Sequence, residues 1–161
     1  MSLYSVNEVI EFAVQIEKNG YAFYDEATKR KDLDQRSRDF LSYLRDQELT
    51  HEQSFLALRS DDDIAQLDLS QDWEMVSNYM RAIIEGRIFD SPEAAIKKAS
   101  EAKSLLEIVN NAIAFEKDTL LFFHAINDGV TNPKVQAVLR KIITEEVSHV
   151  LRLNDFKKTI V

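Results

Sequence analysis

Residues 41–58 read LSYLRDQELTHEQSFLAL, with apolar residues recurring every three or four positions. This spacing is typical of an amphipathic α-helix that buries one face. Glu48 and His51 form a Glu-x-x-His motif on that same face, because helical residues three apart point in one direction. A charged group on a buried face is costly unless it is paired or bound to a metal. The stretch therefore predicts a buried helix that carries ligands.

A second copy of this stretch occurs 98 residues later (48 to 146). Six positions of the first copy recur at that constant offset: Leu41, Leu44, Glu48, His51, Phe55 and Leu58 correspond to Leu139, Ile142, Glu146, His149, Leu153 and Phe156. Each copy also follows a lone glutamate in an apolar frame, Glu17 in the first case and Glu116 in the second. The chain thus carries one three-residue half-site twice.

The frames around the two upstream glutamates match at an offset of 99 residues (17 to 116). Ala13, Glu17, Gly20 and Tyr24 correspond to Ala112, Glu116, Thr119 and Phe123. Two helical hairpins related by a pseudo-twofold axis would bring four carboxylates and two imidazoles together inside one bundle. We therefore predict a site for two iron ions, or for manganese or zinc, with six ligands: Glu17, Glu48, His51, Glu116, Glu146 and His149.

Three neighbouring residues leave alternatives open. Glu145 lies four residues before His149 and could share its helix face, although the offset of 98 selects Glu146. Tyr24 is either a core tyrosine or a hydrogen-bond donor to a ligand carboxylate. His124 has no glutamate three residues before it, and we interpret it as a helix-end histidine.

Capping signals divide the chain into helices. Capping boxes start at Ser5 and Ser104, and prolines 92 and 133 stand at positions that suit the first turn of a helix. The candidate N-cap of the second helix is Asp32 or Asp34, and that of the last helix is Thr131 or Asn132. The expected helices span about 5–30, 32 or 34 to 59, 71–84, 92–103, 105–127 and 133–158. We predict a single all-α domain over residues 1–161, an antiparallel four-helix bundle. Its halves would span about 5–59 and 104–158, with a long crossover of short helices over about 60–103.

Two features of the crossover have simple structural interpretations. The acidic run Asp61-Asp62-Asp63 lacks the spaced oxygens and glycine of a calcium loop, so we interpret it as a solvated helix end. Trp73, the single tryptophan, is interpreted as an anchor of the crossover.

Charge and composition exclude several classes of function. The net charge is −8, whereas binding to nucleic acid or an anionic membrane needs a basic surface. No basic, apolar leader and no apolar run of membrane-spanning length occurs, so we expect a cytoplasmic protein. The chain has no cysteine, which excludes disulfides, thiolate metal sites and iron–sulfur clusters within it.

The chain resembles the ferritin-like superfamily, and within it the rubrerythrin-type di-iron domain, over nearly its full length. The resemblance is carried by AVQIEKNGYAFY at 13–24, AFEK at 114–117 with FF at 122–123, and EEVSH at 145–149. It implies a four-helix bundle with a long second-to-third crossover, and di-iron chemistry that reduces hydrogen peroxide or oxygen. It also implies that Glu48 and Glu146 bridge the metals, with Glu17 and His51, and Glu116 and His149, as outer ligands whose exact pairing stays open.

Two departures from rubrerythrins proper bear on the expected activity. Thr119 stands where those proteins have a further glutamate, one turn after the third-helix ligand, and their four-cysteine rubredoxin-like domain is missing from this sequence. Electrons would therefore come from a separate donor protein, and we expect a homodimer. The main alternative is a non-catalytic bundle, stabilised by zinc or another metal, that acts as a structural or interaction module. Bulk iron storage is a third interpretation.

Overall fold

The computed structural model describes residues 6–59 and 73–160, and every regular element in those ranges is an α-helix. The helices are α1 (Val6–Thr28), α2 (Gln35–Arg59), α3 (Trp73–Gly86), α4 (Pro92–Glu101), α5 (Leu105–Gly129) and α6 (Pro133–Lys157). The predicted all-α fold class is confirmed. None of these helices is both long enough and apolar enough to cross a membrane.

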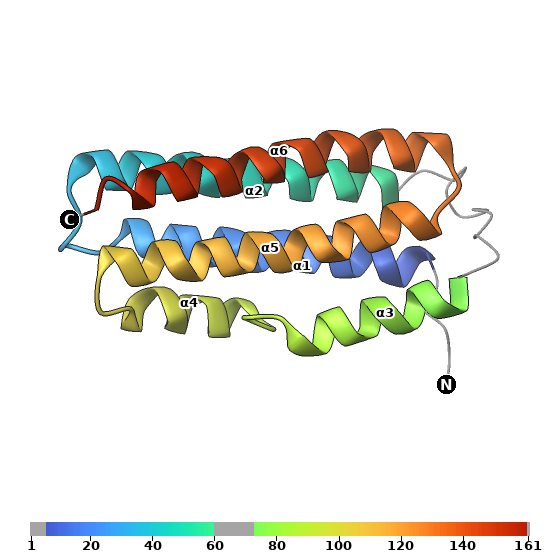
Figure 1. Ribbon diagram of the computed structural model, residues 1–161, viewed down its shortest axis with the longest axis horizontal. Helices are drawn as coiled ribbons and strands as arrows, with labels where there is room; N and C mark the ends of the chain where they lie inside the picture. The colour runs from blue at the N-terminus through green and yellow to red at the C-terminus, as the bar shows by residue number, and fades with distance from the viewer. Residues whose placement is uncertain (1–5, 60–72, 161) are drawn as a thin grey trace.

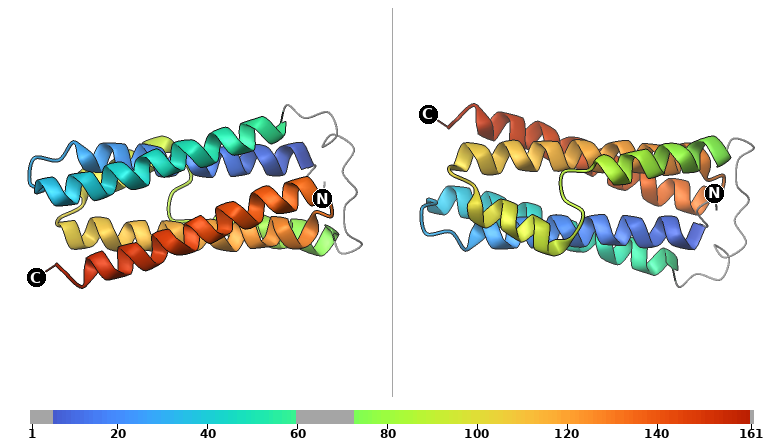
Figure 2. Two further views of the ribbon diagram at one scale, coloured as in Figure 1. Left: turned by 90° about the horizontal axis from the view of Figure 1, so that it is seen from above. Right: turned by 90° about the horizontal axis from the view of Figure 1, so that it is seen from below.

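The four long helices α1, α2, α5 and α6 lie lengthwise as an antiparallel bundle (Figures 1 and 2). α1 packs against α2, and α5 packs against α6, so the bundle consists of two hairpins. α3 and α4 follow one another along the outside of the bundle, where α3 packs on α5 and α4 packs mainly on α1. This is the predicted crossover, which returns the chain to the opposite end of the bundle.

Side-chain caps determine where the helices begin. Asp34 caps α2, because its Oδ1 accepts a hydrogen bond of 2.8 Å from the backbone N–H of Ser37. Asn132 caps α6, accepting from two backbone N–H groups at 2.9 and 3.2 Å. Ser104 caps α5 as predicted, accepting from the N–H of Glu107 at 3.1 Å. The structure thus selects Asp34 and Asn132 from the predicted pairs of caps.

Four helix ends differ from the predicted positions by two residues: α3 and α5 extend past 84 and 127 to Gly86 and Gly129, and two other helices end earlier than predicted. α1 ends at Thr28 and not at Arg30, and α4 ends at Glu101 and not at 103. Arg30 instead donates from Nη1 to the backbone oxygens of Ala99 and Ala102. It therefore binds the carbonyl end of α4, which is a favourable position for a cation. The predicted Ser5 cap, the start of α3 at residue 71 and the run 61–63 lie outside the described residues.

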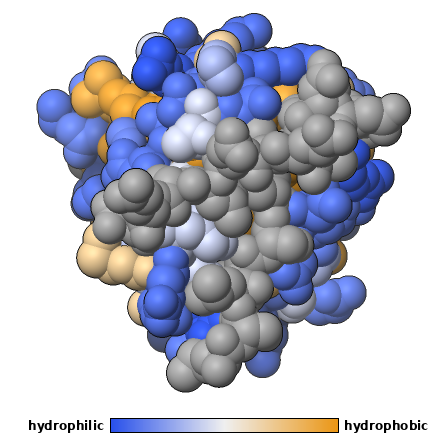
Figure 3. Space-filling view, turned by 90° about the vertical axis from the view of Figure 1, so that its right-hand side faces the viewer, coloured by the Kyte–Doolittle hydropathy of each residue, from blue (hydrophilic) through white to orange (hydrophobic). Residues whose placement is uncertain are grey.

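Apolar side chains fill the bundle and attach the crossover to it. The twelve positions of the duplicated stretch are all buried, as its periodicity predicts. Phe89 stacks between Phe23 and Phe115, with ring centroids 5.3 and 4.8 Å apart. Trp73 is buried against Gly129, which confirms its predicted role as an anchor. Seen end-on, the described part of the surface is mainly hydrophilic (Figure 3).

Candidate metal centre

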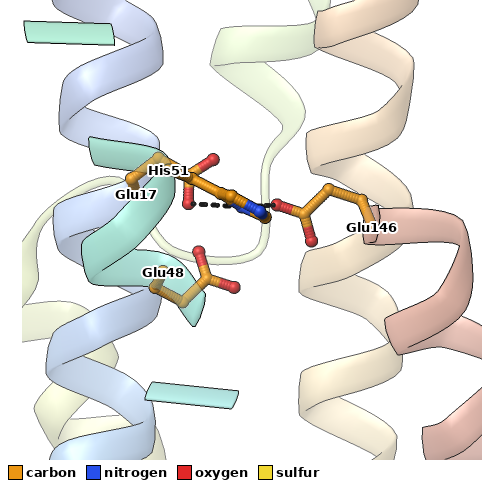
Figure 4. Close-up of side chains that lie close together, drawn as sticks. All are labelled: Glu17, Glu48, His51 and Glu146. Carbon is orange, nitrogen blue, oxygen red and sulfur yellow. Dashed lines mark hydrogen bonds and ion pairs between the residues drawn. The ribbon is translucent and has the colours of Figure 1, made fainter. Parts of the chain in front are cut away.

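The four bundle helices each direct acidic or imidazole side chains into the core at the same level. All of these side chains are at most 1% exposed: Glu17 on α1, Glu48 and His51 on α2, Glu116 on α5, and Glu146 and His149 on α6. The structure therefore brings all six predicted ligands together. Figure 4 shows four of them, with His51 between Glu17 and Glu146.

The six side chains form two overlapping groups that could each hold a metal ion. One group contains Glu17, Glu48, His51 and Glu146, and the other contains Glu48, Glu116, Glu146 and His149. Within each group, one potential ligand atom per residue lies within 4.8 Å of the others. Glu48 and Glu146 belong to both groups, so each lies within reach of both halves of the cluster.

The Glu146 carboxylate lies between the two imidazoles. His51 Nδ1 is 2.8 Å from Glu146 Oε1, and His149 Nδ1 is 2.9 Å from Glu146 Oε2. The same nitrogens are 3.6 Å from Glu17 Oε2 and 3.9 Å from Glu116 Oε1, respectively. Both rings therefore present Nδ1 to the carboxylates. The rings are nearly parallel, with their centroids 5.8 Å apart.

Glu145 approaches the cluster from outside. Its Oε2 lies 2.7 Å from Nε2 of His51, on the opposite edge of the ring from Glu146. Glu145 belongs to neither group of potential ligands, yet it contacts a histidine of the other half of the chain. From the sequence, we considered Glu145 only as an alternative ligand beside His149. Its position next to Glu146 is the one signal that could have predicted its contact with His51 on α2.

Tyr24 combines the two interpretations that its sequence position allowed. Its side chain is fully buried, and its hydroxyl donates a hydrogen bond of 2.6 Å to Glu116 Oε1. Burial and the nearby charge of Glu116 raise the pKa of Tyr24 well above 10.0, so the phenol keeps its proton. His124, by contrast, is exposed and lies outside both groups, five residues before α5 ends at Gly129 and so more than one turn from the helix end.

Space for the cluster depends on the small residue at position 20. A Cβ atom added to Gly20 would come within 2.7 Å of Phe115 Cε1 and 2.8 Å of Glu48 Oε2. The glycine therefore allows Glu48 to lie close to the α1 backbone. At the corresponding position of α5, the Thr119 hydroxyl donates to the carbonyl of Phe115 at 2.9 Å and so is turned toward its own helix.

Several polar atoms of the cluster lack hydrogen-bond partners among the described residues. They are both carboxylate oxygens of Glu17, both of Glu48, Oε2 of Glu116 and Nε2 of His149. A buried acceptor without a donor carries a large desolvation cost. Five unpartnered carboxylate oxygens facing one small region are what a bound cation would satisfy. The residues therefore fit metal ions that prefer oxygen and imidazole nitrogen.

The electrostatics of the cluster also favour added positive charge. Burial raises the pKa of Glu17, Glu48 and Glu116, because it disfavours the charged carboxylate. Burial acts in the same way on Glu146, but hydrogen bonds with His149 and His51 outweigh it and lower the pKa of Glu146. Burial of His51 favours neutral imidazole, yet the hydrogen bond to Glu146 and the nearby negative charge of Glu17 raise its pKa to about 11. Divalent ions would replace these protons.

Comparison with known proteins supports the fold. No protein-family model matches the chain, and none of the curated proteins matches it. Among solved structures, the chain is similar to a crystal structure of a Thermotoga maritima protein provisionally assigned as a ferritin-like diiron-carboxylate protein. The TM-score is 0.70 at 22% identity, and the match covers 99% of this chain and 98% of that one. At this identity the likeness establishes the fold, so the predicted ferritin-like bundle is confirmed; the rubrerythrin-type subdivision stays a prediction.

Proposed function

We propose that this chain is a di-iron oxidoreductase of rubrerythrin type, which reduces hydrogen peroxide or oxygen with electrons from an external donor protein. The observation that carries the proposal is the pair of buried ligand groups that share Glu48 and Glu146. The likeness in fold to a protein assigned as a diiron-carboxylate protein supports it. We further propose that the protein is a cytoplasmic homodimer.

The proposed ligand roles follow from membership of the two groups. Glu48 and Glu146 would be shared by the two ions, because among the described residues they alone belong to both groups. Glu17 and His51 would complete one half, and Glu116 and His149 would complete the other. Each histidine would bind through Nδ1, the nitrogen that faces the carboxylates. Four carboxylates balance the charge of two divalent ions, and the mixed oxygen and nitrogen donors suit Fe(II), with Mn(II) or Zn(II) as competitors.

The protein contributes exclusion of water, orientation and one held proton. Two iron ions supply the two electrons that reduction of a peroxide requires. The six ligands are at most 1% exposed, so bulk water is kept from the reacting groups. Tyr24 fixes one oxygen of Glu116 through its hydroxyl and holds a proton at Oη, 2.6 Å from that carboxylate. Since the sequence has no cysteine, it carries no thiolate iron centre, and the electrons come from another protein.

The proposal is tested by loading the purified protein anaerobically with Fe(II) and following the loss of added hydrogen peroxide. We expect two irons per chain and oxidation of both by peroxide, and we expect Glu48→Ala and Glu146→Ala to lose this reaction. Binding of fewer than two irons, or a reaction rate equal to that of the variants, would contradict the proposal.

The same experiment distinguishes the non-catalytic alternative. A bundle held together by zinc would melt at a higher temperature with bound metal but would not turn over peroxide. Thermal melts with iron, with zinc and without metal, run beside the peroxide assay, therefore separate the two functions. A native mass of one or two subunits would argue against a storage shell.

A further inference from the structure

The ligands of the two halves correspond, but the residues around them do not. The counterpart of Glu145 at the offset of 98 is Gln47, and the counterpart of Tyr24 at the offset of 99 is Phe123. A carboxylate in one half is thus replaced by an amide in the other, and a phenol is replaced by a phenyl ring. These two differences affect opposite sides of the cluster.

His51 is held at both ring nitrogens. Nδ1 faces Glu146 at 2.8 Å, while Nε2 lies 2.7 Å from Glu145 Oε2. When a metal ion displaces the proton between Nδ1 and Glu146, Nε2 keeps its own proton and donates it to Glu145, and the lone pair of Nδ1 becomes free for the ion. A carboxylate that accepts from the outer nitrogen of a histidine fixes the tautomer and makes the inner nitrogen a stronger ligand. His51 is therefore oriented for metal before any ion arrives.

His149 lacks this support within the described residues, because its buried Nε2 has no hydrogen-bond partner. Its ring makes a T-shaped contact with Tyr43, with centroids 6.1 Å apart, and the guanidinium of Arg152 lies over the Tyr43 ring at 5.1 Å from its centroid. Gln47 is partly buried one turn after Tyr43. An aromatic ring thus contacts His149, whereas a carboxylate contacts the outer edge of His51.

The two outer carboxylates, Glu17 and Glu116, also differ in how many of their oxygens are free to bind a cation. Neither oxygen of Glu17 accepts a hydrogen bond from the described residues, so both can bind a cation. Glu116 has one oxygen engaged at 2.6 Å by the hydroxyl of Tyr24. The half that contains Glu17 and His51 therefore has more free carboxylate oxygens and the better oriented imidazole.

We propose that the two metal positions are inequivalent, and that Glu145 positions His51 so that the Glu17–His51 half binds the first ion. The Glu116–His149 half then binds the second ion more weakly and exchanges it more readily. This inference rests on the proposed function, since it assumes two metals at the cluster. Glu145 acts through His51 and is not itself a ligand.

The test is an anaerobic titration of the metal-depleted protein with Co(II), followed by the visible absorption of the bound ion and by calorimetry. The wild type should bind two ions in two resolved steps of one ion each. Glu145→Gln should weaken the first step by about 10- to 100-fold, the usual effect of losing such a partner. Asp155→Asn, an exposed change on the same helix, should leave both steps unchanged.

Gln47→Glu is the reciprocal variant, and it tests the inference even if Glu145→Gln fails to fold. Because Gln47 corresponds to Glu145, we expect the new carboxylate to approach the outer edge of His149 and to strengthen the second step. The inference is overturned if the wild type binds its two ions in steps that cannot be resolved, or if Glu145→Gln titrates like the wild type. In either case, two bound ions would leave the proposed function intact. Failure to bind two ions overturns both.

Discussion

The α1–α2 and α5–α6 hairpins carry the same ligands in the same frame but differ in what surrounds them. Each contributes two glutamates and one histidine at matching positions, all buried. The positions around them have diverged: Gly20 corresponds to Thr119, and Tyr24 corresponds to Phe123. The ligand positions therefore define the site, while the neighbouring residues determine how each half would hold its ion.

The largest expected effect is on the number of metal ions bound, which should differ between variants of a shared glutamate and variants of a glutamate that belongs to one half. Glu48→Ala should abolish binding of both ions, because Glu48 belongs to both ligand groups, whereas Glu17→Ala should remove only one ion. The loss should exceed the roughly 10- to 100-fold effect of an outer partner. Elemental analysis after anaerobic loading and desalting measures the metal per chain.

Asp46→Ala is the matched control for these variants, since Asp46 is an exposed acid on the same helix as Glu48. It should retain two ions. If Glu48→Ala also retained two ions, the two halves would not share a ligand, and the overlapping groups would be a coincidence of packing.

The second expected effect is a strong pH dependence of the stability of the metal-free protein. The pKa values of Glu17, Glu48 and Glu116 are raised above 4.5 in the folded state, so the stability that they contribute is complete below pH 4.5. It is lost as the pH rises through their raised pKa values, because the carboxyl groups must then ionise inside the core. His51 acts in the same direction between 6.5 and about 11. The pKa of Glu146 is lowered, so the stability that Glu146 contributes is present above pH 4.5 and is lost only as the pH falls below that value.

Thermal melts without metal should therefore give a lower Tm at about pH 8 than at about pH 5. Saturating metal should reverse the trend, because the ions replace the protons. Glu48→Gln, which keeps the shape of the side chain but cannot ionise, should reduce the difference. A metal-free Tm that stays level or rises between these pH values would show that the clustered carboxylates do not govern stability.

The third expected effect tests the divergence at Tyr24. Tyr24→Phe removes a buried hydrogen bond of 2.6 Å to Glu116 and should cost about 2 kcal/mol of unfolding free energy. It also makes this half resemble the other, where Phe123 occupies the corresponding position. Denaturant unfolding measures the change, with Tyr79→Phe, at a half-exposed tyrosine, as the control. Equal stability of the two variants would mean that the hydrogen bond has no net value.

The smallest expected effect tests the close approach at Gly20. Gly20→Ala would place Cβ within 2.8 Å of Glu48 Oε2 and closer still to the Phe115 ring. Overpacking costs about 1–3 kcal/mol, and the higher helix propensity of alanine returns about 1, so we expect a net loss near 1 kcal/mol. Gly86→Ala is the control, because a Cβ there meets nothing within 4 Å and should not destabilise. Equal effects of the two changes would contradict the packing described for α1.

Much of the fold could be predicted because its signals are local. The apolar repeat of α2 and α6, the caps at Ser104 and Asn132, and the proline that opens each of α4 and α6 all act within one or two turns. The constant offset then brought distant glutamates into one prediction. The choice between Asp32 and Asp34 could not be made from sequence, because both are aspartates, which cap helices well, and only the backbone conformation decides.

The surroundings of the cluster could not be predicted, because they depend on contacts between helices. That Glu145 reaches His51 on another helix depends on how α6 is rotated against α2. The ends of α1 and α4 depend on Arg30, whose contact with α4 spans 69 and 72 residues of sequence. A repeat in one sequence predicts which residues correspond, but it does not predict which of them touch.

Anomalous diffraction from crystals grown with Mn(II) tests directly whether the duplicated ligands bind two metal ions. We expect two manganese peaks per chain, one within the group of Glu17 and His51 and one within the group of Glu116 and His149, with Glu48 and Glu146 between them. A single peak, no peak, or manganese bound away from these six side chains would contradict this expectation.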